Sequence, residues 1–148
     1  MNVFFDTSVL VAAFWGDHPQ HESSLHVFRE ASRPSAACGM HSLAEIYATM
    51  TALPVRPALA AEQVVLFVEQ TAQRLTTITL DEAEYLTAIR ELADRQLSSG
   101  RVYDALLLAC ARKFRAKIVY TWNYKHFRQL APDLADYIRT PSELKNTS

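Results

Sequence analysis

Three acidic residues and one asparagine stand where this chain is expected to leave a strand or to begin a helix. Asp6 follows one short apolar run and Asn123 follows another, while Glu45 and Asp104 fall near the start of expected helices. Carboxylate and amide oxygens of this kind suit Mg²⁺ or Mn²⁺, which prefer oxygen ligands in octahedral geometry and retain several waters. The pattern therefore predicts a divalent-metal site.

Three of these residues also have an ordinary structural explanation. Asp6 is a good helix N-cap, and Ser42 followed three residues later by Glu45 matches a capping box. Asn123 is a common turn or cap residue. Taken alone, Asp6 and Glu45 favour the capping interpretation.

Asp104 is the most informative of the four, because its surroundings are apolar. The residues after it are uncharged up to Arg112, and Leu107, Leu108 and Ala111 share its helix face. A buried carboxylate without a partner costs several kcal/mol, so it should be paired, protonated or metal-bound. The helix macrodipole favours an acid in the first turn but does not account for apolar neighbours. We therefore interpret Asp104 as a functional residue.

The elements that must position these residues alternate between strands and helices. Apolar and β-branched segments predict short strands at residues 2–6, 35–39, 76–80, 117–122 and 137–139. Helical periodicity, capping signals and prolines predict helices at residues 7–15, 18–32, 41–53, 58–75, 81–97, 101–115 and 123–130. This alternation is typical of an α/β domain with a mainly parallel sheet and helices on both faces. Ligands of such sheets bind beyond the carboxyl ends of the strands, where Asp6 and Asn123 are expected.

The composition is that of an ordinary globular protein. The 148 residues are 49% hydrophobic and 21% charged, which predicts one domain over residues 1–148 with a polar tail from about residue 141. The sequence has no apolar run long enough to span a bilayer and no signal-peptide pattern, so we expect a cytoplasmic protein without membrane contact. Cys38 and Cys110 stand in apolar surroundings and are expected to be reduced core thiols.

Charge is unevenly distributed along the chain, although the net charge of −1 does not by itself favour a nucleic-acid ligand. Residues 1–74 carry seven acids and four bases, whereas residues 75–148 carry nine acids and eleven bases. Between Arg101 and Arg128 there are seven bases and one acid. Such a segment could bind a phosphate backbone, and solvated helix faces have the same composition.

Four segments, taken in order, resemble the motifs of PIN-domain ribonucleases, and most closely those of the VapC-type toxins of type II toxin–antitoxin pairs. The segments are Phe5-Asp6-Thr7-Ser8-Val9-Leu10, Leu43-Ala44-Glu45, Arg101-Val102-Tyr103-Asp104-Ala105-Leu106-Leu107 and Thr121-Trp122-Asn123-Tyr124-Lys125-His126-Phe127. Each motif is weak alone, but separations of 39, 59 and 19 residues between the four polar residues make the set specific. The resemblance extends from Val3 to about Phe127.

The resemblance implies a PIN-like three-layer α/β/α domain with a mainly parallel five-stranded sheet. It also implies Mg²⁺- or Mn²⁺-dependent cleavage of RNA, with transfer RNA as one candidate substrate, by a homodimer whose cognate antitoxin protein covers the site. Asp6, Glu45 and Asp104 would be the metal-binding acids. Many family members have a fourth acid where this chain has Asn123, although Asn also occurs there. The loss of one negative charge should weaken binding of a second metal, which favours a one-metal over a two-metal mechanism.

Four neighbouring residues have side chains that could assist such a reaction. Thr7, Ser8 and Thr121 could orient the water or the phosphate, and capping or turn roles explain them equally well. Arg101 could contact phosphate or pair with an acid.

Other interpretations compete with the metal-dependent endoribonuclease. A phosphatase with an aspartyl nucleophile would need a second acid where this chain has Ser8. A catalytically silent PIN-like module that binds RNA or protein would have no reason to keep three acids together. If the acids were structural and paired with Arg101 or other bases, Asp104→Asn would destabilise the fold.

Overall fold

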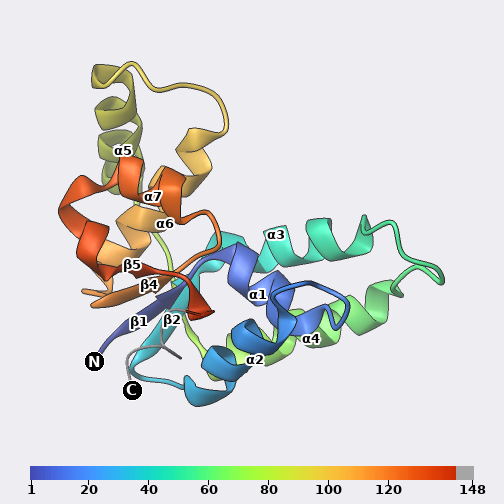
Figure 1. Ribbon diagram of the computed structural model, residues 1–148. Coiled ribbons are helices and arrows are strands. Elements are labelled where there is room, and N and C mark those ends of the chain that lie inside the picture. Colours follow the sequence, from blue (N-terminus) through green and yellow to red (C-terminus); the bar gives the residue numbers. More distant parts are fainter. Residues whose placement is uncertain (143–148) are drawn as a thin grey trace.

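The computed structural model describes residues 1–142, which form a five-stranded sheet whose paired strands are all parallel (Figure 1). The strands are β1 (Val3–Phe5), β2 (Ala36–Gly39), β3 (Thr76–Ile78), β4 (Ile118–Tyr120) and β5 (Ile138–Arg139). Their order across the sheet is β3-β2-β1-β4-β5. The predicted α/β class with a parallel five-stranded sheet is confirmed.

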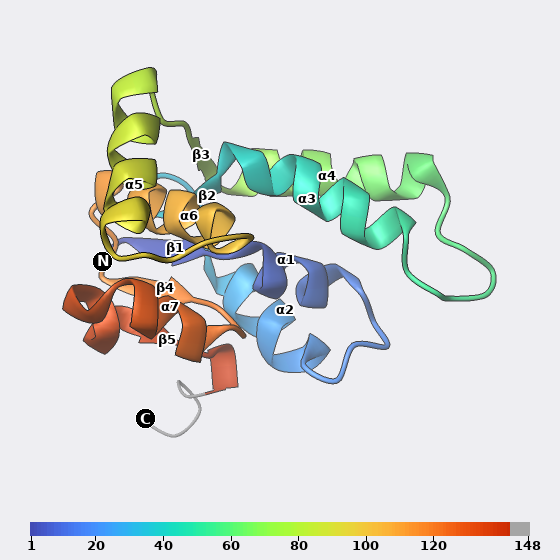
Figure 2. The ribbon, with the colours of Figure 1, turned by 90° about the horizontal axis from the view of Figure 1, so that it is seen from above.

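Helices connect these strands and cover both faces of the sheet. They are α1 (Thr7–Phe14), α2 (His21–Glu30), α3 (Met40–Thr51), α4 (Ala61–Arg74), α5 (Glu82–Asp94), α6 (Arg101–Lys113) and α7 (Tyr124–Leu130), followed by the 3₁₀ helix η1 (Pro132–Tyr137). Figures 1 and 2 show α1 to α4 on one side of the sheet and α5 to α7 on the other. The predicted α-helix boundaries are correct to within three residues, whereas η1 was not predicted.

Alternate residues of the central strands face opposite helical layers. Phe5, Cys38 and Tyr120 pack with residues of α1 to α4, whereas Phe4 and Val119 pack with residues of α5 to α7. Strands of a parallel sheet are buried on both faces, which is why they read as continuous apolar runs in the sequence. The three-layer α/β/α arrangement is therefore confirmed.

The structure can be compared with the predictions of reduced core thiols, no membrane span and a polar tail. Cys38 and Cys110 are buried free thiols, as expected. Among residues 1–142, no helix is both long and apolar enough to cross a membrane. Pro141 is buried, so packing continues into the start of the expected polar tail. The rest of that tail, residues 143–148, lies outside the described residues.

The strand order reverses at β1, which lies between β2 and β4. The chain runs from β1 to β2 and β3 on one side, and then returns to β4 and β5 on the other. In open parallel sheets, such a switch point leaves a crevice at the carboxyl ends of the two flanking strands. Asp6 follows β1 directly, and its backbone N–H donates to the carbonyl of Tyr120, the last residue of β4, at 2.9 Å. The fold thus places Asp6 at the expected crevice.

Gly39 determines how closely α6 packs against the end of β2. A Cβ atom on Gly39 would lie 2.7 Å from Leu107 Cδ2 and 3.8 Å from Cys110 Sγ. Gly39 also directly precedes α3, the helix that carries Glu45, while Leu107 belongs to α6, the helix that carries Asp104. The absent side chain therefore lets the two helices that carry these acids lie close to the same strand.

We expect Gly39→Ala to lower the free energy of unfolding by about 1–3 kcal/mol, because the added methyl group overpacks a buried contact. The matched control is Gly16→Ala, since nothing lies within 4 Å of a Cβ at that position. The control should change stability by no more than about 0.5 kcal/mol. Urea denaturation measures both changes, and equal midpoints for the two variants would contradict this account of the packing.

Candidate active site

Asp6 is buried, and hydroxyl groups hold its carboxylate. It occupies the N-cap position of α1, but its side chain makes no capping hydrogen bond. Instead, Asp6 Oδ2 accepts hydrogen bonds from Ser8 Oγ at 2.7 Å and from Thr121 Oγ1 at 2.8 Å. Asp6 therefore occupies the N-cap position predicted for it, and hydrogen bonding to the backbone of Thr7 and Ser8 lowers the pKa of its carboxyl, but its side-chain hydrogen bonds come from the two hydroxyls. Ser8 donates a hydrogen bond to Asp6. An aspartyl phosphatase would have a second acid at this position instead.

Backbone amides of the segment after β4 orient both hydroxyls. Trp122 N–H donates to Ser8 Oγ at 3.0 Å, and Asn123 N–H donates to Thr121 Oγ1 at 3.0 Å. Because each hydroxyl oxygen accepts from an amide, its single proton is directed elsewhere, in both cases to Asp6 Oδ2. The segment after β4 therefore fixes the orientation of the Asp6 carboxylate.

Glu45 contacts α1 and does not cap the start of its own helix. Because α3 begins at Met40, Ser42 already lies inside the helix and is fully buried. The Thr7 hydroxyl donates to Ser42 Oγ at 2.8 Å and lies 3.3 Å from Glu45 Oε1. The capping-box interpretation of Ser42 and Glu45 is therefore wrong, and Thr7 links α1 to the helix that carries Glu45.

Asp104 lies in the first turn of α6 and is half-buried. Leu107, Leu108 and Ala111, on the same helix face, are 1–3% exposed. The apolar surroundings predicted for Asp104 therefore begin about one turn further along the helix. Asp104 itself lies at the boundary between this apolar core and solvent.

The three acids interact electrostatically, and the pKa of each carboxyl is raised. Burial is the largest cause for all three, and in Asp6 it outweighs the opposing hydrogen bonds from the two hydroxyls and from the backbone of Thr7 and Ser8. The charge of Asp6 also raises the pKa of Glu45. The charges of Asp6 and Glu45 further raise the pKa of Asp104, which reaches about 6. His41 lowers the pKa of Glu45, and His126 lowers the pKa of Asp104, but neither offsets the effect of burial.

Within residues 1–142, no Lys or Arg side chain forms an ion pair with any of the three acids. The Lys and Arg ion pairs in that part of the chain join Arg112 to Asp133 and Lys113 to Glu84. Arg101, which the sequence suggested as a partner for an acid, belongs to neither. The described residues therefore do not support the interpretation of the acids as structural groups paired with bases.

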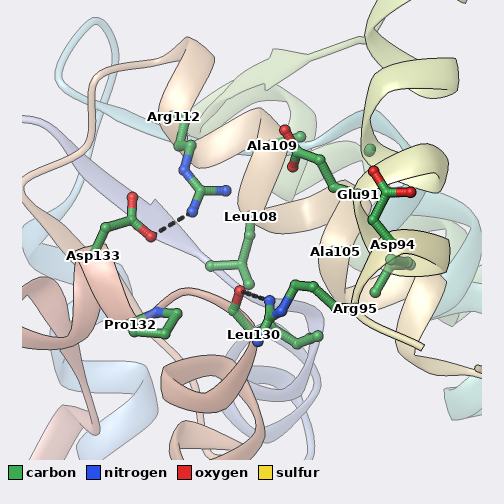
Figure 3. Close-up of a pocket in the computed structure, with 12 residues that line it drawn as sticks. Glu91, Asp94, Arg95, Ala105, Leu108, Ala109, Arg112, Leu130, Pro132 and Asp133 are labelled. Atoms are coloured by element: carbon green, nitrogen blue, oxygen red, sulfur yellow. Dashed lines mark hydrogen bonds and ion pairs between the residues drawn. The ribbon is translucent and has the colours of Figure 1, made fainter. Parts of the chain in front are cut away.

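The bases at the C-terminal end of α6 lie apart from the acids and have partners within the protein. Arg112 is about 12 Å along the helix axis from Asp104. It pairs with Asp133 at 2.8 Å beside a cavity of about 480 Å³ (Figure 3). Arg95 lines the same cavity and donates to the Leu130 carbonyl at 2.7 Å. These contacts favour a structural role for the bases around this cavity over phosphate binding.

The backbone N–H of Asn123 donates to the Thr121 hydroxyl, which in turn donates to Asp6. Asn123 is exposed at the N-cap position of α7, and its side chain makes no capping hydrogen bond. Its position after β4 agrees with the prediction. Among the hydrogen bonds of residues 1–142, however, none joins its side-chain amide to Asp6, Glu45 or Asp104.

The donor chemistry fits a divalent cation, although the side chains do not form a closed cage. As the side chains of residues 1–142 lie, no three His, Cys, Asp or Glu residues are close enough together to hold one metal ion. Mg²⁺ in proteins, however, is usually bound by one or two carboxylates and keeps several waters. Asp6, Glu45 and Asp104 supply carboxylate oxygens, interact through their like charges and have no Lys or Arg partner within residues 1–142. They therefore match that requirement.

The sequence model of the PIN domain matches residues 3–131 of this chain. The chain belongs to the PIN-domain family. Ribonuclease VapC27 of Mycobacterium tuberculosis is 31% identical over 113 residues, which cover 76% of this chain and 79% of that protein. This relative places the chain among the VapC-type PIN-domain proteins, in agreement with the resemblance of the four motifs.

Solved structures of VapC-type proteins share the fold of this PIN domain. The crystal structure of VapC20 of M. tuberculosis, described as a Sarcin-Ricin loop cleaving toxin, gives a TM-score of 0.69 at 16% identity and covers 84% of this chain and 92% of that one. The VapBC-1 structure of nontypeable Haemophilus influenzae gives 0.64 at 18% identity, with coverage of 96% and 99%. At these identities the likeness concerns the fold.

Sequence reasoning missed the roles of two residues near Glu45 in this PIN domain, one beside its carboxylate and one that binds Thr7. His41 Nε2 lies 3.9 Å from Glu45 Oε1, and Ser42 accepts the hydrogen bond from Thr7. His41 precedes Glu45 by four residues and Ser42 precedes it by three, so both lie beside it on the same side of α3. This spacing was the available signal, and the capping-box interpretation concealed it.

We expect Asp104→Asn to stabilise this PIN domain in EDTA at pH 7.5, by about 1–2 kcal/mol after allowance for partial exposure. The pKa of Asp104 in the folded protein, about 6, lies above the ordinary value of 3.8. Ionisation therefore lowers the stability of the fold as the pH rises from about 4 to about 6, and the whole cost is present above that range. Urea denaturation at several pH values should show the gain at pH 7.5 and its loss below about pH 4.

The control is Asp17→Asn, because Asp17 is exposed in the loop after α1. It should change stability by less than about 0.5 kcal/mol at either pH. A loss of stability in Asp104→Asn at pH 7.5 would instead indicate that Asp104 is a structural acid with a favourable partner.

Proposed function

We propose that this PIN-domain protein is an endoribonuclease that depends on Mg²⁺ or Mn²⁺ and hydrolyses phosphodiester bonds in RNA. The observation that carries the proposal is the coupling of Asp6, Glu45 and Asp104 at the sheet switch point, without a Lys or Arg partner within residues 1–142. The naming of VapC27 as a ribonuclease supports RNA as the substrate. So does the description of VapC20 as a toxin that cleaves the Sarcin-Ricin loop.

Asp6, Glu45 and Asp104 would hold the cation. A cation bound there would act as a Lewis acid that polarises the phosphate and lowers the pKa of a coordinated water. Ser8 and Thr121 keep the Asp6 carboxylate in one orientation through their hydrogen bonds to Oδ2.

Further residues would position the other groups of the reaction. Thr7 restrains Glu45. We assign Arg101, in the first turn of α6, to the phosphate of the substrate. Asn123 contributes a neutral side chain where many relatives have an acid, and we therefore propose a one-metal reaction.

We expect Asp6→Asn to reduce RNA cleavage by at least about a hundredfold, because it removes the buried, pre-oriented metal-binding carboxylate. The assay uses a panel of structured RNAs, transfer RNAs included, with Mg²⁺, Mn²⁺ or EDTA. The matched control is Asp17→Asn, in which the same change is made on the exposed loop after α1. Circular dichroism verifies that both variants are folded.

The outcome with EDTA separates the nuclease from its main alternative, a catalytically silent PIN-like module that binds RNA or protein. Cleavage that requires metal and is lost in Asp6→Asn agrees with the proposal. RNA binding without cleavage under any metal condition would indicate the silent module. The absence of both cleavage and divalent-metal binding by calorimetry would contradict the metal-dependent reaction.

We further propose that the protein is the toxin of a toxin–antitoxin pair, acts as a homodimer in the cytoplasm and is inhibited by a cognate antitoxin. The similarity of its fold to the VapBC-1 structure of H. influenzae and to that of VapBC2 from Rickettsia felis supports the toxin–antitoxin pairing. Light scattering of the purified protein tests the dimer, since a monomer at micromolar concentration would contradict it.

A further inference from the structure

An exposed aromatic pair lies beside the acids, between α3 and α6. The His41 and Tyr103 rings are parallel to within 6°, and their centroids are 6.0 Å apart, within the range of offset-stacked rings. Tyr103 is 54% exposed, and so is the side chain of His41. Neither ring fills the core, so both rings are partly open to solvent beside the acids.

The pair adjoins the acid cluster on both helices. On α3, His41 Nε2 lies 3.9 Å from Glu45 Oε1. On α6, Tyr103 immediately precedes Asp104. A substrate whose phosphate lies at the acids would therefore have its neighbouring groups within reach of the two rings.

A small cavity lies next to the rings, at the ends of β2 and β3. It measures about 210 Å³, and residues of α3, α5 and α6 complete its wall. Its lining is mainly apolar, with polar groups from His41, Thr79, Tyr85 and Tyr103. Pockets for drug-sized ligands usually measure about 300–1,000 Å³, so this one suits a single ring system. A small volume, mainly apolar walls and a few polar groups match a nucleobase.

Trp122 and Tyr124, which flank Asn123 in the chain, have other contacts. Trp122 Nε1 donates to Ser24 Oγ at 2.9 Å. The Arg128 guanidinium carbon lies 5.2 Å from the centroid of the Tyr124 ring. Of these aromatic groups near the acids, the His41–Tyr103 pair is therefore the better candidate to receive a ligand ring.

We propose that His41, Tyr103 and the adjacent cavity form a binding subsite for one nucleobase of the RNA, next to the phosphate that is cleaved. The inference rests on the proposed ribonuclease function and adds to it the position where the enzyme contacts a base. Proteins commonly hold unpaired RNA bases by stacking them on aromatic side chains and by hydrogen bonds to their edges. Here the rings supply the stacking surface, and the Thr79 and Tyr85 hydroxyls supply edge contacts.

The first test measures base binding without catalysis. Adenosine, guanosine, cytidine and uridine are titrated separately into ¹⁵N-labelled protein in EDTA, with ribose as the probe that lacks a base. At least one nucleoside should shift the backbone amide signals of Gly39, His41, Thr79 and Tyr103, and ribose should not. Tyr103→Ala should weaken that binding about tenfold, as expected for the loss of one stacking surface.

The matched control is Tyr47→Ala, because Tyr47 is a tyrosine on α3 that is 42% exposed and does not line the cavity. It should bind nucleosides like the unmodified protein. Tyr103→Phe should also retain binding, because the ring remains. Three outcomes would overturn the subsite: shifts confined to other residues, equal weakening by Tyr47→Ala, or a change of oligomeric state in Tyr103→Ala. The last would indicate a contact between protein chains at the aromatic pair.

The second test examines cleavage of a pool of random RNA sequences in Mg²⁺. Tyr103→Ala should lower kcat/KM about tenfold and flatten the base preference at one position beside the cut, while cleavage remains metal-dependent. If the unmodified protein cleaves and Tyr103→Ala keeps both rate and preference, the subsite is wrong and the nuclease stands. If the unmodified protein cleaves no RNA, the proposed function fails, and nucleoside binding alone decides the subsite.

Discussion

Burial of the carboxyls of Asp6, Glu45 and Asp104, with like charges close by, is the constraint on which this end of the molecule depends. Each carboxyl loses hydration on folding, and none has a Lys or Arg partner within residues 1–142. Buried like charges without compensation destabilise a fold, and replacement by neutral residues would relieve the strain. Hydrogen bonds from Ser8 and Thr121 offset part of this cost for Asp6. A divalent cation would offset much more, because it attracts all three carboxylates.

The architecture brings the acids together through a few specific contacts. β1 and β4 are neighbours at the switch point, so the segment after β4 can orient the carboxylate that follows β1. The close approach of α6 to Gly39, at the end of β2, brings the helix of Asp104 near the strand that leads to α3 and Glu45. The same approach places Tyr103 beside His41 and bounds the small cavity. The grouping of the acids and the neighbouring aromatic pair therefore follow from one packing arrangement.

Most of the fold could be predicted because its signals are local, whereas the contacts within the site are not. The apolar runs of β1 and β4 appear in the structure as predicted, and the helix predicted from residue 81 begins with a capping box of Asp81 and Glu84. The similar pattern at Ser42 and Glu45 was misinterpreted, because a capping box depends on where the helix begins, and α3 begins two residues before Ser42. Local patterns place Asp6 at the end of a strand and Asp104 at the start of a helix. They do not show that the Ser8 and Thr121 hydroxyls both donate to one oxygen of Asp6.

The most direct test of this account is an NMR titration of the Asp104 carboxyl carbon, in EDTA and in saturating Mg²⁺. In EDTA, the account predicts an apparent pKa of about 6 for this coupled group. In Mg²⁺ it predicts a pKa well below that value, because the bound cation favours the ionised form. An ordinary pKa near 3.8 in EDTA would show that burial and the neighbouring charges do not act on Asp104 as described. A raised pKa that Mg²⁺ leaves unchanged would show that Asp104 does not take part in holding the cation.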